Sequence, residues 1–312
     1  MKNFRILFLL ISLFVGATSV YAQQDKLLTH FIFDKMSLNP GATGVEIDGV
    51  CGTSVYRNQW DKVVGAPNST IFNVEANMKR FYPGGLGVSF FYDAIGFNRQ
   101  NSLLLNYAYQ LVNENGNKLS AGLGLGILNF GMTPTWVPPT TSLDNSLPTG
   151  FSGTGLDLNL GVYYKSNLGF YAGISATHLN ALQLKNKLSS TAQAYQVDRH
   201  YYLMGGYKRA IGANAVDVQM LVRSVLYKTS IDLNARFLYR DFGYVGLTYR
   251  TSDAISIMLG YNVSRSLSVG YSYDVTLNKL SGISRGSHEI LLKYCRPIPV
   301  PPVTISRHPR WL

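Results

Sequence analysis

Hydrophobic and polar residues alternate strictly along residues 156–165, LDLNLGVYYK. Successive side chains of a β-strand point to opposite faces, so this pattern predicts a strand with one apolar and one polar face. Such an alternation over about ten residues is longer than the usual strand of a globular protein, which has about 5–6 residues. It matches the roughly 9–11 residues that a tilted strand needs to cross a bilayer. The segment is therefore predicted to span a membrane.

The same alternation recurs along most of the chain and predicts fourteen strands. An even number of strands is typical of bacterial single-chain membrane barrels. We therefore predict an all-β fold, a transmembrane antiparallel β-barrel of about fourteen strands. The strands are expected at 49–60, 68–80, 84–94, 97–111, 117–131, 156–166, 168–178, 200–210, 215–226, 228–240, 242–252, 254–263, 266–277 and 286–296.

The lengths of the connections predict how the barrel is oriented. The long connections, 61–67, 132–155, 179–199 and 278–285, are all odd-numbered along the chain, whereas the even-numbered ones are short. Long loops of such barrels are extracellular and short turns are periplasmic. Both termini are therefore expected in the periplasm. The polar, Pro-rich segment 132–155 is expected to contain no strand.

The segments outside the strands divide the chain further. Residues 1–22 have a basic start, an apolar core and a small residue before Gln23, which is the pattern of a signal peptide cleaved near Ala22. Residues 23–48 form a lead-in that either lies in the periplasm or enters the barrel as a partial plug. Residues 49–296 are the barrel, and the Pro-rich tail 297–312 is expected to be extended and periplasmic. The mature protein is expected in the outer membrane.

The composition agrees with a barrel and argues against a soluble domain and a nucleic-acid-binding protein. Hydrophobic residues make up 46% and charged residues only 14%, compared with about 25% charged residues in soluble domains. A barrel is apolar only at alternate positions, so its mean hydropathy is ordinary. The net charge of +11 comes from scattered basic residues and does not favour nucleic-acid binding.

The sequence gives no pattern that predicts an enzyme, a cofactor or a metal site. His288-Glu289 begins like the zinc motif HExxH, but Leu292 stands at the second histidine position. The five histidines lack metal-ligand spacing. A membrane hydrolase would need a serine and a histidine near the outer rim, where Ser175 and His178 are the only candidates.

The polar faces of the predicted strands carry charges of both signs. Buried charges must pair or stay hydrated, and a selective pore would favour one sign in its constriction. The mixture therefore predicts a hydrogen-bonded filling of the lumen, with a passive solute channel as the alternative. The lumen-facing set is Arg57, Glu75, Lys79, Asp93, Asp157, Lys165, Asp217, Arg223, Asp232, Arg236, Asp274, Glu289 and Lys293.

The two cysteines lie in the first and the last predicted strands. In a closed barrel these strands pair, which brings Cys51 and Cys295 to the same rim on the lumen side. They are either joined by a disulfide, which the periplasm permits, or remain two small buried thiols.

Several short segments occur in an order that resembles a known family. They are MSLNPGATG at 36–44, RNQW at 57–60, GAPNST at 65–70, GLGVSFFYDAIG at 85–96 and SHEILLKY at 287–294, with a terminal HPRWL. The chain resembles the PorP/SprF family of outer-membrane proteins of the type IX secretion system. The resemblance implies a role in exporting proteins with a C-terminal secretion signal, or surface adhesins used in gliding. It implies as partners a periplasmic peptidoglycan-binding lipoprotein, the ring and motor proteins, and secreted cargo.

A mixed-charge lumen is a poor conduit for a folded protein, so we expect an anchor or docking platform; a passive outer-membrane porin is the alternative. No cofactor is expected, and outer-membrane lipid is expected to surround the barrel. The candidate contacts at the outer end are Arg57, Asn58, Gln59, Trp60, Gly65, Ala66, Pro67, Asp93, Ile95 and Gly96. Those on the periplasmic side are Asn39, Pro40, Arg310, Trp311 and Leu312.

Overall fold

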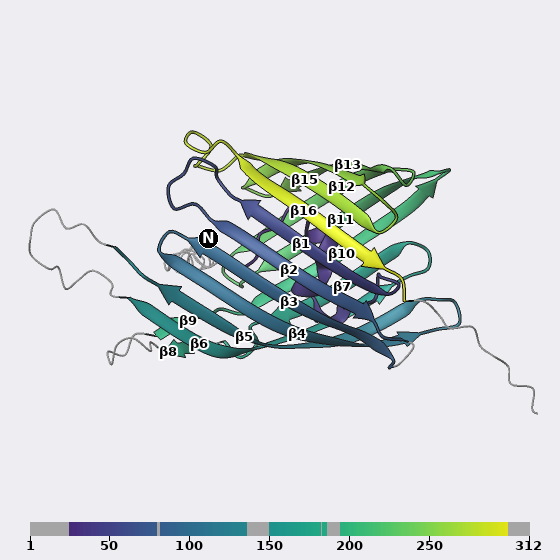
Figure 1. Ribbon diagram of the computed structural model, residues 1–312, viewed down its shortest axis with the longest axis horizontal. Coiled ribbons are helices and arrows are strands. Elements are labelled where there is room, and N and C mark those ends of the chain that lie inside the picture. Colours follow the sequence, from purple (N-terminus) through teal and green to yellow (C-terminus); the bar gives the residue numbers. More distant parts are fainter. Residues whose placement is uncertain (1–24, 80–81, 136–149, 182, 186–193, 299–312) are drawn as a thin grey trace, which may run out of the picture.

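The computed structural model describes residues 25–79, 82–135, 150–181, 183–185 and 194–298. Fourteen antiparallel strands close a barrel in which β1 pairs with both β2 and β16 (Figure 1). The predicted fold class and strand number are confirmed. The barrel strands are β1 (Val50–Asn58), β2 (Asn68–Asn77), β3 (Gly84–Ile95), β4 (Asn98–Val112), β5 (Lys118–Met132), β6 (Phe151–Lys165), β7 (Phe170–Thr177), β10 (His200–Ile211), β11 (Asn214–Ser224), β12 (Thr229–Tyr239), β13 (Gly243–Arg250), β14 (Ala254–Asn262), β15 (Leu267–Thr276) and β16 (Ser287–Arg296).

The alternation in the sequence becomes the difference between the two faces of the barrel wall. On β6, Leu156 is 73% exposed on the outside, whereas Asp157 is 1% exposed on the inside. The other strands repeat this arrangement with Leu, Val, Ile, Phe and Tyr side chains outward. An apolar outer band is what a barrel presents to lipid hydrocarbon. Within the described residues, no helix is both long and apolar enough to cross a membrane.

The two ends of the barrel differ in their connections. We call the end that carries connections 59–67, 178–199 and 277–286 the loop end. The opposite end carries the short connections 113–117 and 212–213, and we call it the turn end; β1 begins and β16 finishes there.

The connection between β5 and β6 is shorter than predicted, because β6 begins at Phe151 and not at residue 156. Phe151 pairs with Met132 of β5, so the expectation that 132–155 contains no strand is wrong for its last residues. The reason is a small apolar cluster at the loop end, in which Phe151 packs with Phe130 and Leu184. Leu184 belongs to a further unpredicted feature, a hairpin of β8 (Gln183–Lys185) and β9 (Ala194–Gln196) inside the connection 178–199.

Residues 25–49 lie inside the barrel, and we call them the plug (purple in Figure 1). The plug starts at the loop end, where Tyr202 near the start of β10 donates a hydrogen bond to Asp25 Oδ2 at 2.5 Å. It finishes at the turn end, where Gly49 lies against Arg296 and Pro297. Its regular elements are η1 (Phe31–Phe33), α2 (Lys35–Leu38) and η2 (Pro40–Ala42).

The described chain therefore begins and ends at opposite ends of the barrel. Asp25 lies at the loop end, whereas Pro297 follows β16 at the turn end. The barrel strands themselves begin and end together, because the start of β1 pairs with the end of β16 at the turn end. The expectation that both termini are periplasmic stays a prediction, since residues 1–24 and 299–312 lie outside the described residues.

The seam between the first and last strands carries both cysteines. Cys51 of β1 is the register partner of Cys295 of β16, and the two are joined by a disulfide with Cα atoms 4.1 Å apart. The bond links residues at the two ends of the barrel sequence, so it covalently closes the sheet at the turn end.

Candidate functional site

The lumen is occupied by an apolar core that the plug and the wall build together. Leu28, Phe31 and Leu38 of the plug are each 3% exposed or less. They pack with inward-facing residues from many strands, among them Ile71 and Tyr202. A barrel of eight strands is filled by its own side chains, whereas a wider barrel leaves a lumen that stays open unless other residues occupy it. Here the plug occupies the lumen.

The plug backbone approaches the wall most closely at two glycines. A Cβ on Gly122 of β5 would lie 2.3 Å from the carbonyl carbon of Pro40, and one on Gly161 of β6 would lie 2.0 Å from Asn39 Oδ1. Only glycine leaves room for η2 at these positions. Asn39 fixes the contact, since its Nδ2 donates to the Val162 carbonyl oxygen at 3.0 Å.

A buried charge network joins the plug to β1, β15 and β16. Arg57 donates to Glu289 at 3.0 Å and to Asp274 at 2.7 Å, and all three side chains are at most 1% exposed. The backbone N–H groups of Thr29 and His30 donate to the Glu289 carboxylate at 2.9 and 2.7 Å. Hydrogen bonds to charged groups are the strong ones in a low-dielectric interior. Arg57 and Glu289 therefore hold the start of the plug to the barrel seam.

A second set of ion pairs, from β11, β12 and β13, holds the same segment and adjoins the first, since Arg250 lies 3.7 Å from Asp274. Asp232 of β12 accepts from Arg223 at 2.6 Å and from Arg250 at 3.1 Å. The same guanidinium groups donate to plug carbonyls, Arg223 to Lys26 and Arg250 to Leu28, each at 3.2 Å. The expected ion-paired lumen is therefore present among the described residues. Arg250 was not predicted, because it ends its strand beside a connection.

Asp34 is a buried carboxyl group of the plug that pairs with no cation in a salt bridge among the described residues. Its carboxylate accepts hydrogen bonds from Ser37 and from Asn73 of β2. Burial raises the pKa of Asp34 to about 6; the nearby Glu75 acts in the same direction, and Lys26 opposes it. A folded-state pKa above the usual value means that the folded protein binds the proton more tightly than the unfolded chain does.

The contribution of Asp34 to the free energy of unfolding is therefore expected to fall as pH rises from about 4 to about 6. The ordinary pKa of 3.8 and the folded pKa of about 6 bound this window. The loss is on the order of 3 kcal/mol, since one pKa unit corresponds to 1.36 kcal/mol. Asp34→Asn should remove it, because the amide carries no charge; its oxygen still accepts from Asn73, and its NH2 group donates to the Ser37 hydroxyl in place of the bond that the carboxylate accepted. Denaturant midpoints at pH 4 and pH 7 measure this, with Asp48→Asn at an exposed plug position as the control. An unchanged pH dependence in Asp34→Asn would contradict the assignment.

The mouth of the barrel at the loop end is hollow. A cavity of about 550 Å³ lies between the first plug residues and the loops, lined by Asp25, Trp60, Tyr202 and Leu280 among others. Trp60 is half-buried there, and its backbone N–H donates to Ser287 Oγ at 3.0 Å. Trp60, which was predicted as a contact at the outer end, thus lines the mouth.

The predicted contacts after β1 and those at the end of β3 meet at the loop end. The Gly96 N–H donates to the Gly65 carbonyl at 2.9 Å, and Ser69 Oγ donates to Asp93 at 2.6 Å. Ile95 is 39% exposed beside them. The first bond joins the connection after β1 to the tight turn after β3, and the second links β2 to β3. Ala66 and Asn58 lie next to them and are half-buried.

Several other predicted contacts are not accessible in this conformation. Arg57 is buried because its side chain pairs with Glu289 and Asp274 in the lumen. Gln59 and Pro67 are buried at the two ends of connection 59–67, where the Gln59 N–H donates to the Pro67 carbonyl oxygen. Asn39 and Pro40 are buried inside the barrel, not exposed at its periplasmic rim, because η2 packs on the wall glycines. Arg310, Trp311 and Leu312 lie outside the described residues.

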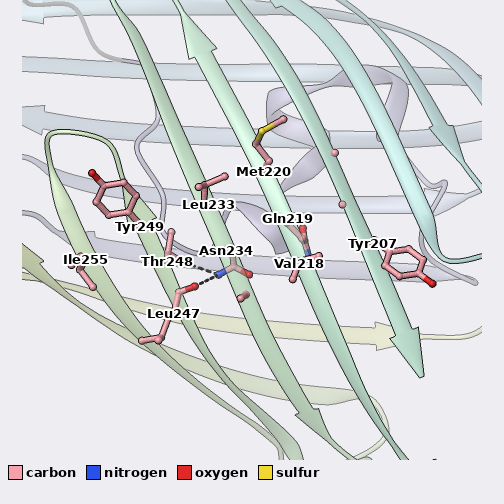
Figure 2. Close-up of a pocket in the computed structure, with 13 residues that line it drawn as sticks. Tyr207, Val218, Gln219, Met220, Leu233, Asn234, Leu247, Thr248, Tyr249 and Ile255 are labelled. Carbon is pink, nitrogen blue, oxygen red and sulfur yellow. Dashed lines mark hydrogen bonds between the residues drawn. The ribbon is translucent and has the colours of Figure 1, made fainter. Parts of the chain in front are cut away.

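The outer face carries a groove of about 680 Å³ across β10–β14 (Figure 2). Its outward side chains include Tyr207, Met220, Leu233 and Tyr249, all of them exposed. Asn234 points the other way and donates to Thr248 Oγ1 at 2.7 Å (Figure 2). The groove is apolar and faces outward, so lipid hydrocarbon covers it in a membrane.

The short motifs noted in the sequence contact one another in space. Arg57 of RNQW binds Glu289 of SHEILLKY, and Met36 and Thr43 of MSLNPGATG lie against Gly87 of GLGVSFFYDAIG. The motifs therefore build the contact between plug and wall. Sequence order alone could not indicate this, because each contact joins segments far apart in the chain.

The comparisons with known proteins agree with this architecture. The model of the family described as "Type IX secretion system membrane protein PorP/SprF" matches residues 20–294. No curated protein matches the sequence significantly.

The similar solved structures are barrels that form channels. The CymD monoaromatic hydrocarbon channel is 14% identical, with a TM-score of 0.52 over 85% of this chain and 92% of that one. A mutant of the TodX monoaromatic hydrocarbon channel is 9% identical, with a TM-score of 0.49 over 84% and 94%. A triple-mutant porin from Rhodopseudomonas blastica is 8% identical, with a TM-score of 0.33 over 80% and 99%. At these identities, the similarity to the first of them shows the fold alone.

Proposed function

Because the chain belongs to the PorP/SprF family of type IX secretion system membrane proteins, we propose that it is a plugged outer-membrane anchor and docking platform of that system. The observation that supports this role is the plug, which packs against the wall with apolar contacts, close glycines and paired charges. A lumen filled in this way is unsuited to passing a folded protein. The platform serves cargo with a C-terminal secretion signal, or gliding adhesins, and it needs no catalytic chemistry.

In this proposal the loop end faces outward and the turn end faces the periplasm. Long loops carry recognition surfaces in membrane barrels, which assigns cargo to the loop end. The turn end and the tail 297–312 then face the periplasmic peptidoglycan-binding lipoprotein and the ring and motor proteins. The signal peptide is removed near Ala22 before insertion.

Deletion of the gene tests this function directly. Mass spectrometry of the medium, the periplasm and the outer membrane should show that proteins with the C-terminal signal leave the medium and accumulate in the periplasm, while other barrels stay normal. Loss of a single adhesin would mark a platform dedicated to that cargo. Unchanged export with altered uptake of a solute would overturn the proposal in favour of a passive porin.

A charge at the accessible part of the loop end should weaken docking. Ile95→Asp places a carboxylate beside Gly65 and Gly96, and desolvating an unpaired charge in an interface costs a few kcal/mol. We expect docking to weaken by about tenfold or more, since 1.4 kcal/mol is tenfold. The measurement is secretion by deletion cells that carry the variant at wild-type outer-membrane levels.

Leu226→Asp is the matched control for Ile95→Asp. Leu226 is 81% exposed in the connection between β11 and β12, and it too lies at the loop end. Equal secretion by the two variants and the wild type would show that Ile95 is not part of the docking surface.

A further inference from the structure

Three potential metal ligands from distant segments meet at the loop end. They are Asp25 at the start of the plug, His178 directly after β7 and His200 at the start of β10. One ligand atom of each lies within 4.8 Å of the others. His178 Nε2 is 3.8 Å from Asp25 Oδ2. Only small side-chain movements separate this arrangement from bonds of about 2.0–2.2 Å to a common ion.

The hydrogen bonds around the two imidazoles orient them as ligands. His178 Nδ1 is 2.9 Å from Asp157 Oδ1, and His200 Nδ1 is 3.0 Å from the Asp198 carbonyl oxygen. A carboxylate and a carbonyl only accept, so each Nδ1 carries the proton and each Nε2 is left to bind. A metal-binding histidine characteristically donates its other ring N–H to a carboxylate or a backbone carbonyl.

The environment supplies a second indication of a ligand. The ring of His200 is 94% buried and its Nε2 has no hydrogen-bond partner, although buried polar atoms are normally paired. A cavity of about 90 Å³ adjoins Asp25, His178 and His200, with Asn98 and Gln100 also in its lining. It has room for a metal-bound water.

We propose that Asp25, His178 and His200 form a binding site for a divalent transition-metal ion that fastens the start of the plug to the wall between β7 and β10. Two imidazoles and one carboxylate with an open position suit zinc or another first-row ion. The ion bridges the plug and the wall, so its binding favours the docked plug. This inference does not depend on the proposed role in secretion.

Zinc titration of the chelator-treated full-length protein in detergent tests the site. Calorimetry should show one Zn²⁺ ion bound per chain, and Co²⁺ should give a ligand-field absorption band. His178→Gln and Asp25→Asn should each weaken binding at least tenfold. Asp157→Asn, which changes only the partner of the His178 ring, should weaken it by about 10–100-fold.

His288→Gln is the matched control, because His288 lies on β16 and contacts Tyr271 instead of the cluster. It should bind Zn²⁺ like the wild type. Asp25 lies outside every strand, so Asp25→Asn keeps the test valid if a wall variant fails to fold. The absence of Zn²⁺ and Co²⁺ binding to the wild type, or unchanged binding to Asp25→Asn with an intact barrel, would overturn the proposal.

Discussion

Deleting residues 26–46 is expected to convert a non-conducting barrel into an open pore. These residues form nearly all of the plug, and their removal takes away the plug side of the apolar core. Fourteen strands enclose more space than their own side chains fill, so water and ions would enter. Planar-bilayer recordings of the purified proteins should show long-lived channels for the deletion and none for the wild type.

The wall should withstand that deletion because its charges pair with one another. The wall arginines bind wall carboxylates, as in the pairs Arg57–Asp274, Arg223–Asp232 and Arg236–Asp217. Without the plug these pairs become hydrated but stay matched. Truncation after residue 298 is the control, since it leaves every described contact in place. Equal conductance of the deletion and the wild type would show that the plug does not close the barrel.

Replacing Arg57 by methionine is expected to destabilise the protein by about 3–5 kcal/mol, the usual result of removing one partner of a buried ion pair. Arg57 is 1% exposed, and its loss leaves Glu289 and Asp274 facing each other without this cation. Methionine keeps most of the side-chain volume, so the effect reports the lost charge. Denaturant unfolding in detergent measures it.

Arg265→Met is the control for Arg57→Met, because Arg265 is exposed in a turn at the turn end. Such surface changes usually stay within about 0.5 kcal/mol. The Arg57→Met variant should also expose residues 25–49 to protease, since the bonds to Thr29 and His30 depend on a correctly placed Glu289. If Arg57→Met were as stable as Arg265→Met, the buried charge network would not stabilise the protein as argued.

The strands could be predicted because their signal is local. Alternation along residues 156–165 reports the two faces of β6 directly, and strands such as β5 and β13 alternate in the same way. The start of β6 at Phe151 was missed because it depends on a cluster with Leu184 of a distant hairpin. The PorP/SprF family suggested by the motifs is confirmed by the match over residues 20–294.

The candidate site was harder to predict because its contacts join distant segments. Arg57 was correctly predicted to face the lumen, but it was also selected as a partner contact, and its buried pair with Glu289 leaves it inaccessible. Trp60, selected as a contact at the outer end, lines the mouth. Alternation indicates which face a side chain occupies, but not which partner it meets across the lumen. Asp25, His178 and His200 do not show the short spacing of a metal-binding motif in the sequence, since only the closed barrel brings the three together.

A disulfide that locks the plug in place tests the central claim most directly. A Cβ on Gly87 would lie 3.1 Å from Thr43 Cγ2, so Thr43→Cys with Gly87→Cys can form a bond between plug and wall. The Met36 side chain must shift, which its flexible thioether permits.

The measurement is secretion of C-terminal-signal proteins by cells carrying this pair, with and without reductant, beside each single variant. The account predicts normal secretion with the plug locked, because cargo docks on the barrel and does not pass through it. Secretion that stops in the oxidised double variant and returns on reduction would contradict the account and make the lumen the export path.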